Sequence, residues 1–242
     1  MATMTGLFNT SINIHLVKES DITIGDCVNL LYKSALVVKK ITKQDQIWYL
    51  TGHSKKEASQ YIVFSGDKVN QNALDIFHRH YKKNYPLINE SMWNGQPDGF
   101  ACEISHFMKF RDNPGKVNLI IDMDQRVSNT LDMIDPLQLL TKENGKSWIK
   151  VDSKGYWLHN RNVFPDRIYV GWMLYIPHVL LPELIPEAAR VIPVIEFGKQ
   201  KGTIIVSTEE IFDGSNKEHV GKANDIEIKL LDLGLLPLMT EL

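Results

Sequence analysis

Histidines and aspartates that could do chemistry occur at a few places in the 242-residue sequence. His78 and His80 lie two residues apart in a stretch of helical periodicity, and such histidines face different sides of a helix and cannot bind one ion. Asp122 and Asp124 follow an apolar, strand-like stretch, a position that nucleases and phosphotransfer enzymes use for metal-binding carboxylates. Together with His106 they define one alternative function, a small metal-dependent hydrolase or nucleotide-handling enzyme.

Other catalytic and cofactor motifs are missing from the sequence. No Gly-x-Ser-x-Gly element marks a serine nucleophile, and the 15 glycines form neither a dinucleotide-binding nor a phosphate-binding loop. A nucleic-acid-binding surface would require basic residues interleaved with aromatic ones. The lysine pairs at 39–40, 55–56 and 82–83 are not interleaved in this way. We therefore predict no catalytic residues, no metal, no cofactor and no enzymatic activity.

Acidic side chains are a more informative group. They gather in two regions, one that spans a strand end and the next helix, and one that follows a strand near residue 207. Helix N-termini and solubility favour such residues, but a basic partner would also gain association rate and specificity from them. The predicted partner-binding residues are Asp122, Asp124, Asp132, Asp135, Glu209, Glu210 and Asp213, with Met123 and Met133 as exposed apolar contacts beside the favoured first group.

Hydrophobic periodicity predicts the elements that position these residues in the first part of the chain. Alternation predicts strands at 11–17, 46–50, 100–110 and 117–123, the last two as a hairpin. Helical spacing predicts one helix that starts after Thr23 with a capping box to Asp26, and two more at 72–84 and 129–140. The stretch around Trp93 is predicted to be a turn-rich loop.

In the second part of the chain, residues 167–176 are apolar on both alternate faces, which is typical of a strand buried on both sides. We predict that this is the central strand of the sheet, with Gly171 allowing something large, or another backbone, to approach closely. A hairpin is expected from 148–151 and 156–158, a short helix at 186–191 and a strand at 202–207. A last helix starts after Asn216 and ends at Gly234.

This irregular order of helices and hairpins predicts an α+β fold, with a mixed or antiparallel sheet and helices packed on it. Length and a 43% hydrophobic content fit one domain over 1–242, with a two-lobed division near 142–146 as the alternative. The net charge of −2 disfavours nucleic acid and anionic membranes as partners. Without a signal peptide or an apolar run of spanning length, we expect a cytoplasmic protein, either monomer or homodimer.

The second part of the chain resembles the Immunity protein 52 family, the immunity proteins of bacterial polymorphic-toxin and type VI secretion systems. Three stretches carry the resemblance: Phe-Pro-Asp-Arg-Ile-Tyr-Val-Gly-Trp-Met at 164–173, Gly-Thr-Ile-Ile-Val-Ser-Thr at 202–208, and the residues from His219 to Pro237. Trp93-Asn94-Gly95 is a looser match. The resemblance is expected to extend over nearly the whole chain.

The resemblance implies a protein without enzymatic activity, which binds a cognate secreted nuclease toxin of the restriction-endonuclease-like class. It would block the toxin's active site in the cytoplasm of the producing bacterium, where the nucleic-acid substrate is. Because toxin-contacting surfaces vary between such pairs, no contact residue is carried over from the family, and the predicted interface residues depend on charge alone.

Overall fold

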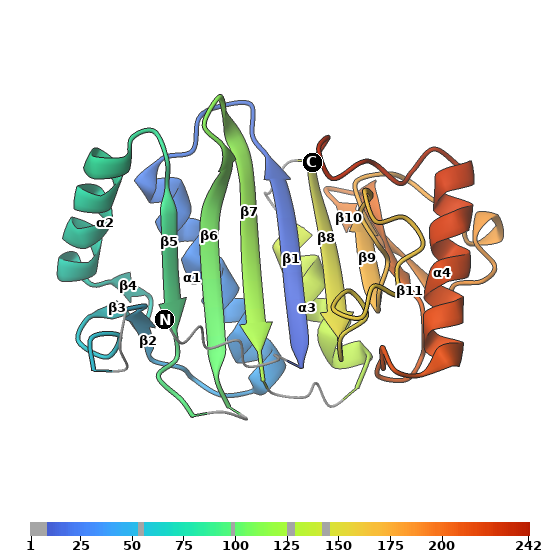
Figure 1. The fold of residues 1–242 in the computed structure, drawn as a ribbon, viewed down its shortest axis with the longest axis horizontal. Helices are drawn as coiled ribbons and strands as arrows, with labels where there is room; N and C mark the ends of the chain where they lie inside the picture. The colour runs from blue at the N-terminus through green and yellow to red at the C-terminus, as the bar shows by residue number, and fades with distance from the viewer. Residues whose placement is uncertain (1–8, 53–55, 98–99, 125–128, 142–145) are drawn as a thin grey trace.

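The computed structural model describes residues 9–52, 56–97, 100–124, 129–141 and 146–242 (Figure 1). Its strands are β1 (Thr10–Val17), β2 (Trp48–Leu50), β3 (Ile62–Ser65), β4 (Lys68–Val69), β5 (Asn89–Trp93), β6 (Cys102–Phe110), β7 (Asn113–Met123), β8 (Lys146–Ser153), β9 (Met173–Ile176), β10 (Arg190–Glu196) and β11 (Lys199–Val206). Its helices are α1 (Ile24–Thr42), α2 (Gln71–Asn84), α3 (Leu131–Thr141), α4 (Lys217–Asp232) and a 3-10 turn, η1 (Pro182–Leu184).

Within the described residues, the strands form one 11-stranded sheet in the order β10-β11-β9-β8-β1-β7-β6-β5-β2-β3-β4. Every ladder between these strands is antiparallel. Helices and strands follow one another irregularly along the chain, so the predicted α+β fold is confirmed, in its antiparallel form. No helix in the described ranges has the length and apolar character that crossing a membrane would need.

The helices cover the sheet on different faces. In Figure 1, α1 and α3 lie behind the middle of the sheet, and α4 lies in front of its β9 and β11 end. The rear face of the middle strands is apolar, with Ile12, Ile14 and Leu16 of β1 buried there. A second apolar cluster joins α4 to the sheet through side chains such as Leu174 and Ile226. The rear apolar cluster extends across the sheet from Trp48 of β2 to Ile204 of β11, whereas the apolar cluster on the front lies at the α4 end.

Capping residues fix the ends of α1 and α4, the two helices that the sequence predicts best. Thr23 and Asp26 form a capping box at the start of α1, with the Asp26 N–H donating to the Thr23 hydroxyl at 3.1 Å. Asn216 caps α4 by accepting from the Glu218 N–H at 2.9 Å. Gly234, at φ +70°, follows the last turn of α4 in the left-handed conformation that ends many helices.

The prediction of a central strand at 167–176 is wrong. Only Met173–Ile176 forms a strand, and β9 is third from one edge of the sheet. Gly171 adopts φ +55° and turns the chain before this strand, although the predicted close approach of another backbone holds, because the Val151 oxygen lies 3.1 Å from where a Cβ would be. The Ser207 hydroxyl donates to the Gly171 oxygen at 2.8 Å and keeps the turn in place.

Two further predictions of elements are wrong. Residues 156–158 form turns, because the Tyr156 side chain is buried against α4 and does not continue a ladder. Residues 186–191 form no helix; η1 precedes them and β10 begins at Arg190. The predicted loop from Trp93 starts one residue later: Trp93 ends strand β5, where its indole N–H donates to the Ala58 oxygen at 2.8 Å, and residues 94–97 form neither helix nor strand. The proposed division near 142–146 falls mostly on residues 142–145, outside the described residues.

Candidate partner-binding surface

The front of β6, β7 and β1 is a sheet face that no helix of the described residues covers (Figure 1). Because side chains alternate along a strand, the residues between the buried apolar ones point to this side. We call this surface the open face. Its residues are Glu103, Ser105, Phe107 and Lys109 from β6, Lys116, Asn118, Ile120 and Asp122 from β7, and Ser11, Asn13 and Val17 from β1. His15 of β1 lies on the same side but is buried.

The register of the strands makes one end of the open face acidic. Glu103 of β6 lies opposite Asp122 of β7, which lies opposite Ser11 of β1. Ser11 in turn lies opposite Asp152 of β8. Carboxylates directly opposite each other on neighbouring strands repel one another, so this arrangement does not stabilise the sheet. We call Glu103 and Asp122, with Asp152 at their side, the acidic row.

Asp122 is held in an environment that disfavours its charge. Burial raises the pKa of Asp122 to about 6, the Glu103 carboxylate adds to this shift, and the Ser11 hydroxyl opposes it. An ionised carboxylate that is partly withdrawn from water gains most from a cation that comes close to it. The acidic row is thus suited to a basic group supplied from outside.

Asp152 marks the border between the open face and the part of the chain that α4 covers. Its Oδ2 accepts from the Trp157 N–H at 3.1 Å, and burial raises the pKa of this carboxyl group. Beside it, the Lys150 ammonium lies over the Tyr169 ring, 3.9 Å from the ring centre. Burial lowers the pKa of Lys150 to about 8, while Asp152 opposes that shift. Asp152 therefore has a cation of its own chain nearby, whereas Glu103 and Asp122 form no ion pair with any of the residues that the structure describes.

At the other end of the open face, lysines contact the last residues of the chain. The Lys109 ammonium donates to the carbonyl oxygens of Met239 and Leu242, the second at 2.8 Å. The Lys116 ammonium donates to the Glu241 carbonyl oxygen at 2.9 Å. These cations already have acceptors, so the two ends of the open face differ in what they offer to a partner.

The structure divides the first predicted acidic group between the two sides of the sheet. Asp122 lies on the open face, and Asp124 follows the end of the same strand, with its N–H donating to the Ala101 oxygen at 2.9 Å. Asp132 and Asp135 lie on α3, behind the sheet. The Lys43 ammonium lies 3.3 Å from the Asp132 carboxylate, which also accepts from the Asn129 side-chain amide. The Asp132 N–H donates to the Asn129 side-chain oxygen at the start of the helix. Asp135 is exposed.

The second predicted acidic group is mostly engaged with cations of the chain. Arg190 donates two hydrogen bonds to one Glu209 oxygen and one to the other, at 2.7–2.9 Å. The Lys154 ammonium lies 2.9 Å from Asp213 and, with Ser215, holds the pKa of that carboxyl group far below its usual range. Glu210 is exposed and accepts from the Thr208 hydroxyl through its main-chain oxygen. This group has less charge to offer a partner than the acidic row.

The prediction of exposed apolar contacts at Met123 and Met133 is wrong, since both side chains are fully buried in the main core. Glu103 was missed by charge reasoning because it stands alone in the sequence. Its alternation with the buried residues of β6 shows that it faces outward, but only the pairing of β6 with β7 shows that it lies beside Asp122.

The hydrolase constellation is not assembled. His106 pairs with Leu119 of β7 and Glu90 of β5 on the rear face, where it is fully buried and burial lowers its pKa to about 4. Asp122 points to the opposite face of the sheet, so the two cannot act on one substrate. Among the residues that the structure describes, no group of three or more His, Cys, Asp or Glu side chains could hold a metal ion.

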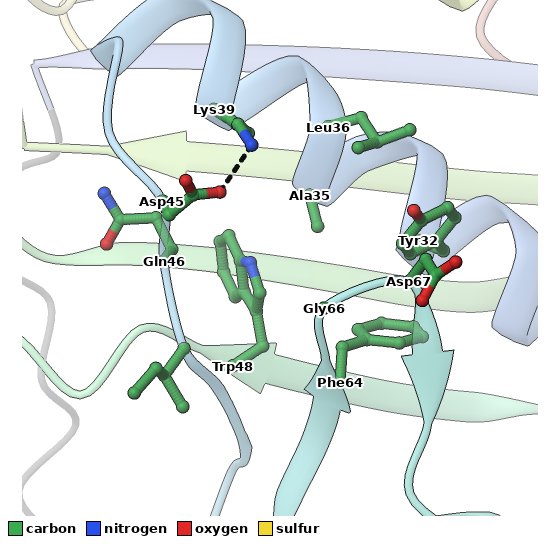
Figure 2. Close-up of a pocket in the computed structure, with 11 residues that line it drawn as sticks. Tyr32, Ala35, Leu36, Lys39, Asp45, Gln46, Trp48, Phe64, Gly66 and Asp67 are labelled. Carbon is green, nitrogen blue, oxygen red and sulfur yellow. Dashed lines mark ion pairs between the residues drawn. The ribbon is translucent and has the colours of Figure 1, made fainter.

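A hollow of about 440 Å³ lies at the far end of the sheet, between α1 and strands β2 and β3 (Figure 2). Trp48 and Phe64 form its floor, and both are nearly buried. Lys39 and Asp45 form an ion pair of 2.6 Å at its rim. The hollow has no nucleophile with an adjacent base and is separate from the acidic row, so it adds nothing to the site.

Residues 143–239 match the family model of Immunity protein 52. The resemblance expected from the sequence is confirmed over this range. It does not extend over nearly the whole chain as expected, since the match begins in front of β8 and leaves out Trp93. A search of curated proteins gave no significant match. The match supports an immunity protein.

The part that matches Immunity protein 52 contains β8 to α4, and its quoted motifs mainly build the fold. Glu227 of α4 is almost fully buried and accepts hydrogen bonds from the Tyr156 hydroxyl at 2.7 Å, the Val163 N–H at 2.8 Å and the Val170 N–H at 3.0 Å. This carboxylate ties the segment before β9 to α4. The acidic row, by contrast, is formed largely by strands in front of the matched range.

Proposed function

We propose that this chain is an immunity protein that binds and neutralises a cognate secreted nuclease toxin of the restriction-endonuclease-like class in the bacterial cytoplasm. The observation that carries the proposal is the match of residues 143–239 to the Immunity protein 52 family. It is supported by a sheet face without a covering helix, which leaves room for a protein partner. We further propose that residues 1–242 act as one domain, because β8 pairs with β1 across the sequence.

We assign the toxin contact to the acidic row of the open face. A nuclease cleft must be basic to hold phosphate, and a carboxylate without a cation of its own chain gains most from such a partner. Glu103 and Asp122 meet this condition better than Asp132, Glu209 or Asp213, each of which has a cation within 3.3 Å. Contact there would place the inhibitor where the nucleic acid has to bind.

The test compares two double variants that remove equal charge. Glu103→Gln with Asp122→Asn alters the open face, and Asp132→Asn with Asp135→Asn alters α3 behind the sheet. Survival of cells that express the toxin and binding kinetics at low and high salt are measured for both. We expect the open-face variant to bind at least tenfold more weakly, with a smaller salt dependence, and the α3 variant to resemble the original protein.

Two results would contradict this assignment. If the open-face variant protects and binds like the original protein while the α3 variant fails, the toxin docks behind the sheet. If the toxin binds labelled DNA and the immunity protein at the same time, inhibition does not occur by blocking the active site. The family resemblance implies a toxin gene beside the gene of this chain. Failure of the original protein to bind a nuclease encoded there would refute the proposed function itself.

A further inference from the structure

The hairpin of β10 and β11 ends in an aromatic residue that almost completely faces solvent. Glu196 pairs with Lys199, so the connection consists of Phe197 and Gly198 alone. Both residues have positive φ, 49° and 73°, as a two-residue turn of type I′ requires. The Phe197 residue is 94% exposed, more than any other large apolar residue in the described ranges.

Neither the turn nor the core explains a phenylalanine at this position. The first central residue of such a turn is usually Asn, Asp or Gly, because other side chains crowd the backbone in the left-handed region. A side chain this exposed buries almost no apolar surface within the chain. The fold would be at least as stable with asparagine at 197, so the reason for the aromatic ring lies outside the fold.

Other exposed apolar residues lie on the same part of the structure. Ile195, at the end of β10, is 55% exposed, and Val179 is 59% exposed. The segment that contains Val179 is fixed to β11, since the Thr203 hydroxyl donates to the His178 oxygen at 2.8 Å and accepts from the Leu180 N–H at 3.1 Å. An exposed apolar group on an ordered hairpin is typical of a protein interaction site.

The edge of the sheet itself is poorly suited to adding a strand from another chain. Pro193 lies within β10 and has no N–H to donate, and the ladder shifts register between Val194 and Ile195. Proline and bulges are features that prevent pairing at sheet edges. A partner would therefore contact the side chains at the tip of the hairpin and would not extend the sheet.

We propose that Phe197 is an anchor residue that inserts into an apolar pocket on the toxin. This inference rests on the proposed function, in which the partner is a protein that is bound tightly and specifically. A rigid two-residue turn presents the ring with little loss of side-chain freedom, which favours a tight contact. The hairpin adds a second contact to the acidic row, which steers the toxin by charge.

The deciding variant is Phe197→Asn, because asparagine suits the turn better than phenylalanine. We expect its melting temperature to equal or exceed that of the original protein, while its affinity for the purified, catalytically inactive toxin domain falls at least tenfold. Phe197→Tyr keeps the ring and should keep most of the affinity. Leu131→Asn, which alters another exposed apolar residue on α3 behind the sheet, should leave affinity unchanged.

The outcomes separate the two proposals. Unchanged affinity of Phe197→Asn, with the original protein binding the toxin, overturns the anchor and leaves the proposed function intact. If the original protein does not bind the toxin, the proposed function fails and the anchor on the toxin fails with it. If light scattering shows that Phe197→Asn only dissociates an oligomer, the ring contacts a second copy of this chain, and the inference is wrong.

Discussion

Replacing Asp122 by asparagine should stabilise the free protein at neutral pH. In the unfolded chain this carboxyl group has a pKa near 3.8, and in the folded protein burial raises the pKa to about 6. Because the folded protein binds this proton more tightly than the unfolded chain does, the free energy of unfolding falls as the pH rises from about 4 to above 6 and Asp122 ionises. The full penalty at pH 7.5 is about 3 kcal/mol. Asparagine removes that penalty and keeps the side chain's shape.

The measurement is urea unfolding of the original protein and Asp122→Asn at several pH values from 4 to 7.5. We expect the variant to be more stable by roughly 2–3 kcal/mol at pH 7.5, allowing for relaxation around the site. The difference should shrink to below about 1 kcal/mol at pH 4, where the Asp122 carboxyl group is protonated in the folded protein and only about half ionised in the unfolded chain. Asp135→Asn, which alters an exposed residue of α3, should change stability by less than about 0.5 kcal/mol.

A pH-independent difference would refute this reasoning, because it would show that the effect does not arise from ionisation. A variant that is less stable than the original protein at pH 7.5 would also refute it. In that case the bond between Asp122 and Ser11 would outweigh burial. The prediction matters for the proposed function, since a toxin-binding defect in a variant with a more stable fold cannot be attributed to unfolding.

Three further predictions concern the fold and the absence of turnover. Gly171→Val should lower the free energy of unfolding by about 1–3 kcal/mol, because the site is left-handed and closely approached, and an unchanged melting temperature would contradict this. Glu227→Ala should cost roughly 3–5 kcal/mol in urea unfolding, because it leaves the Val163 and Val170 N–H groups unpaired and removes one of the two partners of the Tyr156 hydroxyl. Purified protein should leave DNA, RNA and nucleotides intact with Mg²⁺, Mn²⁺ or Zn²⁺; activity that is lost in Asp122→Asn or His106→Ala would refute this.

Elements with strong local signals could be predicted from the sequence. The capping box at Thr23 and the Asn216 cap act over a few residues, and the structure forms both where expected. The hairpin of β6 and β7 also forms, but its turn lies at 111–112, and residues 113–115, which were expected to make the turn, belong to β7. Where an element depends on distant contacts, the prediction failed. Tyr156 has the character of a strand residue, but its hydroxyl bonds to Glu227, 71 positions away.

The acidic row could likewise be predicted from the sequence only in part. Asp122 could be selected from the sequence as an acidic residue at a strand end, but its neighbour Glu103 comes from another strand and becomes visible only through the register. Asp132 could not be separated from Asp122, because nothing local shows that one lies behind the sheet and the other in front. A one-residue change in the register of β6 or β7 would move Glu103 or Asp122 to the other face of the sheet.

Asp122 and Phe197 have one property in common that most residues of this chain do not share. Asp122 lowers the stability of the free protein, and Phe197 adds nothing to it. Asparagine would suit the fold better at each of these positions. Phe197 lies within the part that matches Immunity protein 52, but other residues of that part, such as Glu227, Gly171 and Ser207, are held by several contacts within the chain. Residues of this second kind build the scaffold. The toxin-binding residues should then be sought at positions where the residue present does not suit the fold. Asp122→Asn and Phe197→Asn test this expectation directly, since each should preserve or raise the stability of the protein while it weakens toxin binding.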